Sequence, residues 1–348
     1  MQVMSTIAKR FFQIIGLGAL VLSSSPGFTQ SNDRPAKIRT ALKKAEAFLI
    51  QIQKPDGAIR DTINPLFETW ETILAATALH KINTDTSAPP LKKAIRFLRN
   101  NENDDGLICH NQKCKKAYCL ETTAAYFSLL MQMGEIEKVR VRIGQIVGMQ
   151  KNTGQWEIGN PDVIEQKEFP SITAFVLNMM KDAGQKPTYA KEAIDWMLNN
   201  QTRNGNWGSA WEYYECPAYA LWPVMKWLRG RKDSRSLIAF KKATEYIQQA
   251  QSKDGSWFYS DAGGKKTVSP QLQTALMLSA LQNDRKSNKT MIEKGIDFLL
   301  AQQDPTGYWD GGDFPIPNQQ YIKREYVFAT SLCIMVLNDY LKNLPAVK

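Results

Sequence analysis

The chain has 348 residues, 43% hydrophobic and 10% aromatic, which is enough for a substantial core. Its formal net charge is +10, from 44 Lys and Arg against 34 Asp and Glu. The basic residues are scattered and form no dense run, so they indicate a solvated surface, and no nucleic-acid partner is expected.

The first 30 residues are predicted to be a secretory signal peptide. Lys9 and Arg10 precede an apolar run from Phe11 to Leu22, and small or polar residues follow. The run is short for a membrane span of about 20 residues, although an uncleaved anchor is the alternative. We therefore expect an exported protein, secreted or periplasmic.

A turn motif recurs six times along the rest of the chain. Its four clearest copies begin at Gln150, Gln201, Gln251 and Gln303, each followed by Gly at the fourth position and Trp at the sixth. Two degenerate copies carry Ile in place of Trp and begin at Gln53 and Glu102. The glycines lie 48 to 52 residues apart, and a period near 50 residues indicates a repeat architecture.

Each repeat contains two helical patterns. The first is amphipathic, with apolar residues at three- and four-residue spacing, as in 41–53, 90–100, 190–200, 237–251 and 292–303. The second follows the glycine turn and is apolar on most sides, as in 69–80, 120–133, 172–181, 218–228, 271–281 and 326–337. We find no period-two pattern that predicts a strand.

A helix that is apolar on most sides must be buried on most sides, so the two patterns predict an inner and an outer ring. We therefore expect an all-α fold, a closed (α/α)6 toroid forming a single domain over 34–345. Closure also removes the exposed apolar end faces of an open solenoid.

The motif residues are predicted to be scaffold. The Gln can hydrogen-bond unpaired backbone groups around the turn, and the Gly permits a left-handed turn. The Trp then covers the neighbouring helix end with a large apolar surface.

These Gln-x3-Gly-x-Trp copies, preceded by aromatic–aliphatic pairs such as Trp196-Met197 and Phe298-Leu299, resemble the QW motifs of squalene-hopene and oxidosqualene cyclases. The chain is similar to a single toroid of that prenyltransferase-like α/α family. Protein prenyltransferase β-subunits, complement thioester domains and some polysaccharide lyases share the toroid, so the fold does not select a function.

The resemblance to terpene cyclases implies an Asp-x-Asp-Asp-Thr-Ala acid at the start of an inner helix. The best match is Cys-Leu-Glu-Thr-Thr-Ala over 119–124, which puts Glu121 on the proton-donor position. Cys119 and Thr122 replace the flanking acids, so the motif is degenerate and catalysis stays open. The alternative role for Glu121 is compensation of the helix dipole.

The zinc-dependent prenyltransferase assignment is excluded by residue types. The nearest equivalent of its Asp-x-Cys element is Glu215 and Cys216 preceded by Tyr214, without the Asp. The only histidines, His80 and His110, do not fall at inner-helix starts. We predict no cofactor, and the thioester motif is also absent.

Acidic and aromatic residues gather at the predicted starts of the inner helices and in the preceding loops. Glu71 and Glu121 could form an acid/base pair for glycosidic chemistry, while Arg324 and Tyr326 are candidate bases for a lyase. The candidate substrate-binding residues are Trp70, Tyr118, Trp211, Tyr213, Tyr214, Glu215, Tyr219 and Tyr326. Further acids there are Glu68, Glu168, Glu212 and Glu325. In the alternative interpretation the acids compensate helix dipoles and the aromatic residues fill the barrel.

Export permits disulfides, and a bridge between Cys109 and Cys114 is the first expectation. A bridge between Cys119 and Cys216 is the second. A metal site made of Cys109, His110, Cys114 and Cys119 is the alternative, although it lacks the usual paired spacings.

Three functions stay open. The first is a toroid that binds, and if catalytic transforms, a terpenoid or other apolar ligand in its central cavity. The second is a carbohydrate-active lyase or hydrolase on acidic glycans, with exposed Trp211 and Tyr213. The third is a non-catalytic interaction scaffold with a filled barrel centre, where Tyr126, Phe175 and Trp222 either plug or line the barrel. Peripheral membrane contact is a further open alternative.

Overall fold

The computed structural model describes residues 33–61, 67–159, 169–207, 216–258, 268–282, 287–315 and 322–344. The predicted signal peptide lies outside these residues. Within them no helix is both long and apolar enough to span a bilayer.

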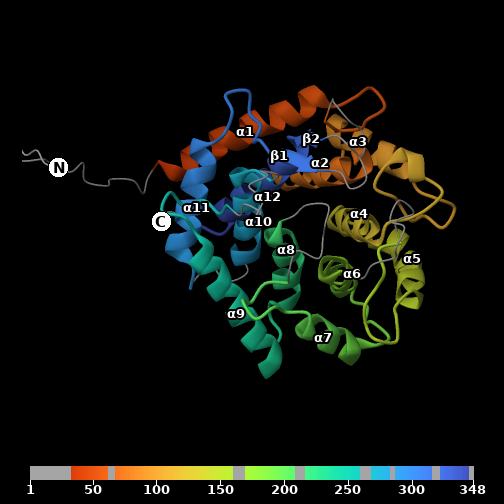
Figure 1. The fold of residues 1–348 in the computed structure, drawn as a ribbon. Helices are drawn as coiled ribbons and strands as arrows, with labels where there is room; N and C mark the ends of the chain where they lie inside the picture. The colour runs from red at the N-terminus through yellow and green to blue at the C-terminus, as the bar shows by residue number, and fades with distance from the viewer. Residues whose placement is uncertain are drawn as a thin grey trace, which may run out of the picture.

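Twelve α-helices of the described residues form two concentric rings (Figure 1). The outer ring consists of α1 (Arg34–Ile52), α3 (Pro89–Asn100), α5 (Ile136–Gly148), α7 (Ala190–Asn199), α9 (Ser234–Ala250) and α11 (Lys289–Ala301). The inner ring consists of α2 (Glu68–Ile82), α4 (Leu120–Gln132), α6 (Pro170–Asp182), α8 (Pro217–Leu228), α10 (Pro270–Leu281) and α12 (Val327–Lys342). Each inner helix packs on the next, and α12 packs on α2, so the ring closes. The predicted all-α (α/α)6 toroid is confirmed.

One short hairpin departs from the all-helical expectation. Strands β1 (Gly312–Pro315) and β2 (Ile322–Glu325) pair antiparallel, with Gly312 opposite Glu325. The expectation of no strand is wrong here because four residues are too few for a recognisable period-two alternation. A single turn of 3-10 helix, η1 (Gln112–Cys114), also lies in the second repeat.

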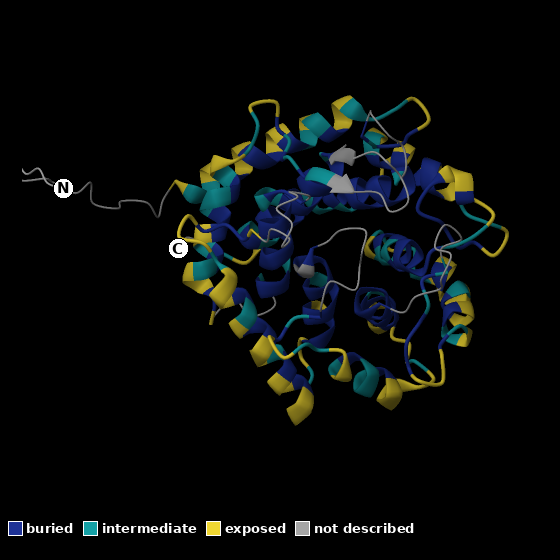
Figure 2. Ribbon diagram, viewed as in Figure 1, coloured by how far each residue is buried: buried dark blue, intermediate teal, exposed yellow. Residues whose placement is uncertain are grey.

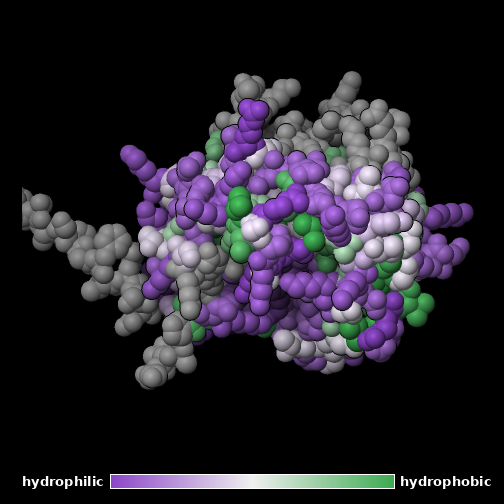
Figure 3. Space-filling view, turned by 90° about the horizontal axis from the view of Figure 1, so that it is seen from below, coloured by the Kyte–Doolittle hydropathy of each residue, from purple (hydrophilic) through white to green (hydrophobic). Residues whose placement is uncertain are grey.

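Burial follows the predicted division between the rings. Inner helices are buried along most of their length and outer helices expose one face (Figure 2). In α12 every residue from Val327 to Asn338 is buried, whereas α3 buries one face only. The side of the toroid around α7 and α9 is mainly hydrophilic, with scattered hydrophobic residues (Figure 3).

The motif glutamines hold each turn against the next outer helix. In five copies the Gln side-chain amide donates both to the carbonyl of its motif glycine and to a backbone carbonyl in or directly before that helix, at 2.8–3.2 Å. Gln303 donates to Gly307 and to Ala41 of α1, both at 2.9 Å, and so joins the last turn to the first helix. These contacts confirm the scaffold role of the glutamines and show how the ring closes.

The motif tryptophans and glycines fit the same tight junction. Each Trp Nε1 donates to an outer-helix carbonyl ten residues earlier at 2.7–2.8 Å, for Trp156, Trp207, Trp257 and Trp309. All four are fully buried. Gly154 has a φ of 102°, and a Cβ there would lie 2.2 Å from the backbone nitrogen of Ala193 in α7. A side chain at this glycine would therefore separate the turn from the next helix.

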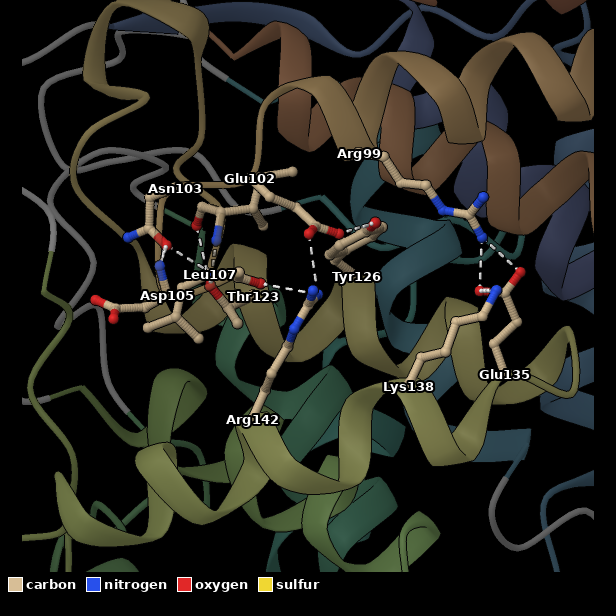
Figure 4. A network of polar contacts seen from close by, with 12 residues as sticks. Arg99, Glu102, Asn103, Asp105, Leu107, Thr123, Tyr126, Glu135, Lys138 and Arg142 are labelled. Atoms are coloured by element: carbon tan, nitrogen blue, oxygen red, sulfur yellow. Dashed lines mark hydrogen bonds and ion pairs between the residues drawn. The ribbon is translucent and has the colours of Figure 1, made fainter.

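The second repeat replaces the amide bridge by charged contacts (Figure 4). Glu102 stands at the motif Gln position, pairs with Arg142 at 3.0 Å and accepts a hydrogen bond from the Tyr126 hydroxyl at 2.7 Å. Tyr126 therefore reaches the repeat turn, so it does not supply the plug or lining of the barrel centre. Beside this network, Arg99 of α3 pairs with Glu135 at 2.6 Å.

If the glutamine bridges hold the ring closed, Gln303→Ala should lower the free energy of unfolding by about 1–3 kcal/mol, because two carbonyls lose a donor. Urea denaturation followed by circular dichroism measures the change. The control is Gln302→Ala, whose side chain is exposed and whose loss should cost less than about 0.5 kcal/mol. Equal stability of the two variants would contradict the closure role.

Candidate active site and central cavity

Glu121 is a buried acid at the start of α4. Its side chain is 4% exposed, and the Tyr219 hydroxyl of α8 donates to its Oε1 at 2.7 Å. Burial raises the pKa of Glu121 to about 7, and the Tyr219 hydrogen bond opposes the rise. The carboxyl group is therefore poised to hold a proton near neutral pH, as a general acid must.

The rest of the cyclase-like motif is structural. Thr123 accepts from the backbone nitrogen of Ile108 at 3.1 Å and donates to its carbonyl at 3.0 Å. Inner-helix threonines make the same bond to the turn in other repeats: Thr72, Thr173, Thr274 and Thr330. This periodic Thr was not predicted, although its recurrence after the turns is visible in the sequence. Among the matching residues, Glu121 is the one with an acid side chain.

Cys119 and Cys216 are free, buried thiols, so the second expected disulfide is absent. They immediately precede α4 and α8. Burial, with the charge of Glu121 beside Cys119, raises the pKa of Cys119 to about 12, and burial raises that of Cys216 to about 12. Thiols held protonated in this way are poor nucleophiles.

Glu71 belongs to a different polar group from Glu121. Its carboxylate and those of Asp61 and Glu325 are buried and approach within 4.8 Å of one another. Glu71 Oε2 accepts from the Asp61 backbone nitrogen at 2.9 Å, and Asp61 accepts from the backbone nitrogen of Tyr326 at 3.2 Å. Three such carboxylates could hold a hard divalent cation. They also join the first turn to the start of α12.

The predicted binding residues divide between the barrel centre and its edge. Trp70 lies edge-on to Phe175, with ring centroids 5.9 Å apart, and Tyr219 contacts Phe175, Trp222 and Phe328 at 6.2–6.5 Å. These five residues form what we call the aromatic layer: Trp70, Phe175, Tyr219, Trp222 and Phe328.

Tyr118 and Tyr326 lie away from the aromatic layer. The ring of Tyr326 contacts that of Tyr308, with centroids 4.7 Å apart, and the ring of Tyr118 lies against Gly159. Glu68, another predicted acid, pairs with Arg60. The remaining candidates lie outside the described side chains: Glu168, Trp211, Glu212, Tyr213, Tyr214, Glu215 and Arg324.

A cavity of about 720 Å³ occupies the toroid between the aromatic layer and the last turns of the inner helices. Its apolar wall comes from Ile73, Leu74, Ala125, Phe175, Trp222 and Leu332. Its rim comes from last-turn residues such as Lys81, Gln132, Asp182 and Asp339. Phe175 and Trp222 therefore line the centre. The binding site was expected at the starts of the inner helices. This expectation is wrong for the cavity, which lies toward the ends of these helices.

Cys109 and Cys114 are joined by the expected disulfide. The loop they close presents the His110 carbonyl to the backbone nitrogens of Thr69 and Trp70, at 3.1 and 3.3 Å, and so caps α2. In this disulfide form the two sulfurs are bonded to each other and do not act as thiolate ligands, although the ligand atoms of Cys109, His110 and Cys114 lie within 4.8 Å of one another.

The family model described as the squalene-hopene cyclase C-terminal domain matches residues 161–342, which is more than half of the chain. The chain therefore belongs to the squalene-hopene cyclase family.

Individual relatives agree with this assignment. Squalene–hopene cyclase of Zymomonas mobilis is 28% identical over 158 residues, covering 41% of this chain and 24% of that protein. The Bradyrhizobium diazoefficiens enzyme is 22% identical over 309 residues, covering 75% and 46%. The chain thus spans less than half the length of these two relatives.

A solved structure of similar fold is a variant of the type II terpene cyclase MstE from Scytonema in complex with its substrate, geranylgeranyl dihydroxybenzoate. Its TM-score is 0.71 at 16% sequence identity, covering 89% of this chain and 99% of that one. At this identity the likeness shows the fold.

The buried acid should make stability depend on pH. The pKa of Glu121 is near 7 in the folded protein against 4.5 as its ordinary value, so the folded state binds more protons between these pH values. The free energy of unfolding should therefore fall as pH rises from about 4.5 to 7. The stabilising contribution of Glu121, about 3 kcal/mol at low pH, should be gone once the pH exceeds about 7.

The Glu121→Gln variant isolates this contribution because it keeps an acceptor for Tyr219 and removes the titration. Urea denaturation of both proteins from pH 4.5 to 7.5 measures it. The stability of the native protein relative to the variant should decline across that range, and a constant difference would contradict the raised pKa.

Proposed function

We propose that the protein binds an apolar ligand of the terpenoid class in its central cavity. The observation that carries the proposal is the cavity itself, whose volume of about 720 Å³ falls within the range of about 300–1,000 Å³ usual for small-molecule sites. Membership of the squalene-hopene cyclase family and the terpenoid-like substrate of the Scytonema neighbour support the same ligand class.

The wall chemistry favours such a ligand. Apolar side chains from α2, α4 and α12 surround the space, and the rings of Phe175 and Trp222 face it at right angles to each other. An isoprenoid chain would be removed from water on these sides, while the charged residues of the lining are concentrated at the rim. Among the residues that the structure describes, those of the aromatic layer fill part of the barrel, as an interaction scaffold requires, and the cavity lies beside them.

We also propose that the protein works outside the cytoplasm. The apolar run of the first 30 residues and the Cys109–Cys114 disulfide support export, since disulfides persist in oxidising compartments.

Filling the cavity should weaken ligand binding. Ala125→Trp places a large ring in the apolar wall, whereas Val141→Trp adds the same ring on the outer helix α5, where Val141 is 81% exposed. Native mass spectrometry of protein purified from its own host should show an extractable apolar adduct on the native protein and the Val141 variant, and less on the Ala125 variant. Absence of any adduct, combined with no binding of added polyprenes, would overturn the proposal.

Proton-initiated cyclisation is the second candidate, and the observation favouring it is Glu121. This buried acid holds a proton near neutral pH, and the aromatic layer could stabilise carbocations through its ring faces. Glu121 is connected to the cavity wall through Tyr219, which contacts Phe175 and Trp222. A substrate would have to displace or pass Tyr219 to meet the acid.

Incubation with linear polyprenes, followed by gas chromatography–mass spectrometry, tests this candidate. Cyclic products from the native protein should be lost in Glu121→Gln by at least about 100-fold, the usual contribution of a general acid, while cavity binding persists. Equal turnover by both proteins would exclude Glu121 as the proton donor, and absence of products from both would leave binding as the function.

A further inference from the structure

We infer that the cavity ligand carries an anionic head group, a carboxylate or phosphate, held at the cavity rim by Lys181 and Arg229. This inference rests on the proposed function, because it names the chemistry of the ligand in the same cavity. It concerns the ends of the inner helices, opposite to the acid Glu121.

The charges lining the rim do not balance. A second cavity of about 400 Å³ adjoins the first and shares Lys181, Arg229 and Gly230 with it. The two cavities are lined by six basic residues, Lys81, Lys181, Lys226, Arg229, Arg231 and Lys232, and by three acidic ones, Asp182, Asp233 and Asp339. The lining therefore has an excess of three positive charges.

Each acid is already paired with one base. Lys81 pairs with Asp339 at 2.6 Å, Lys226 with Asp182 at 3.3 Å, and Arg231 with Asp233 at 3.2 Å. Among the described residues this leaves Lys181, Arg229 and Lys232 without a carboxylate partner. Two of these, Lys181 and Arg229, line both cavities, so the unbalanced charge lies where the cavities meet.

Capping of the helix ends does not account for these two side chains. Positive side chains near helix C-termini commonly serve the terminal carbonyls. At the ends of α6 and α8, however, backbone N–H groups already bond the terminal carbonyls of Met179, Met180, Lys181, Met225 and Leu228, at 2.8–3.1 Å. The Lys181 ammonium and Arg229 guanidinium groups are thus available to a ligand.

The position of this charge relative to the apolar wall defines the ligand. Asn178 lies on α6 one turn before Lys181, and Trp222 of the aromatic layer lies on α8, which Arg229 directly follows; both also line the cavity. A chain lying along the apolar wall would bring a terminal group to the rim. A carboxylate or phosphate there would gain charge-assisted hydrogen bonds, whereas a hydroxyl would gain ordinary ones.

Three ligands with one chain and different heads test the inference: farnesyl phosphate, farnesoate and farnesol. Isothermal titration calorimetry of the native protein should show tighter binding of the two anions than of farnesol, and the difference should shrink as salt is added. The combined substitutions Lys181→Gln and Arg229→Gln should weaken anion binding about 5- to 10-fold and leave farnesol binding unchanged.

The matched control is the pair Lys43→Gln and Lys44→Gln on α1, which removes the same net charge from exposed outer positions. Anion binding that falls equally in the control would overturn the inference, because it would then reflect net charge. Farnesol binding as tightly as the anions would also overturn it while leaving the proposed function standing. Failure of all three ligands to bind the native protein would count against the proposed function itself.

Discussion

The fold depends on one side-chain amide used repeatedly. Each motif Gln donates to the carbonyl of its own glycine turn and to a carbonyl of the next outer helix, so one residue fixes both the turn and the spacing between repeats. The buried Trp secures the same junction to the preceding outer helix. Because the last Gln reaches α1, the contact that spaces neighbours also closes the ring, and closure confines the inner helices around a common axis.

Confinement of six inner helices leaves a space that the aromatic layer divides. On one side of the layer lie Glu121 and the carboxylates of Asp61, Glu71 and Glu325 near the helix starts. On the other side lies the apolar cavity, which extends to the helix ends and their basic rim. Tyr219 belongs to both sides, since its hydroxyl bonds the acid and its ring packs in the layer.

The sequence predicted the toroid because its information is periodic: turn glycines, amphipathic outer helices and apolar inner ones recur about every 50 residues. It predicted the Cys109–Cys114 bridge because a short loop brings these residues together. It predicted a central cavity but not its position, which is toward the inner-helix ends, where small residues such as Ala125 and Ser128 line it. Periodicity identifies a buried face but not where that face is left unfilled.

Glu121 matches the proton-donor position in sequence but does not line the central cavity in the structure. The match requires the acid to lie at the start of an inner helix. In the structure, the aromatic layer separates that end of α4 from the cavity. Burial at this position is also what raises the pKa of Glu121 to about 7. The Tyr219 hydrogen bond opposes this rise, because it stabilises the ionised carboxylate. Under the proposal of proton-initiated cyclisation, a substrate that displaced Tyr219 would remove this hydrogen bond and raise the pKa of Glu121 further, so ligand access would favour the protonated acid.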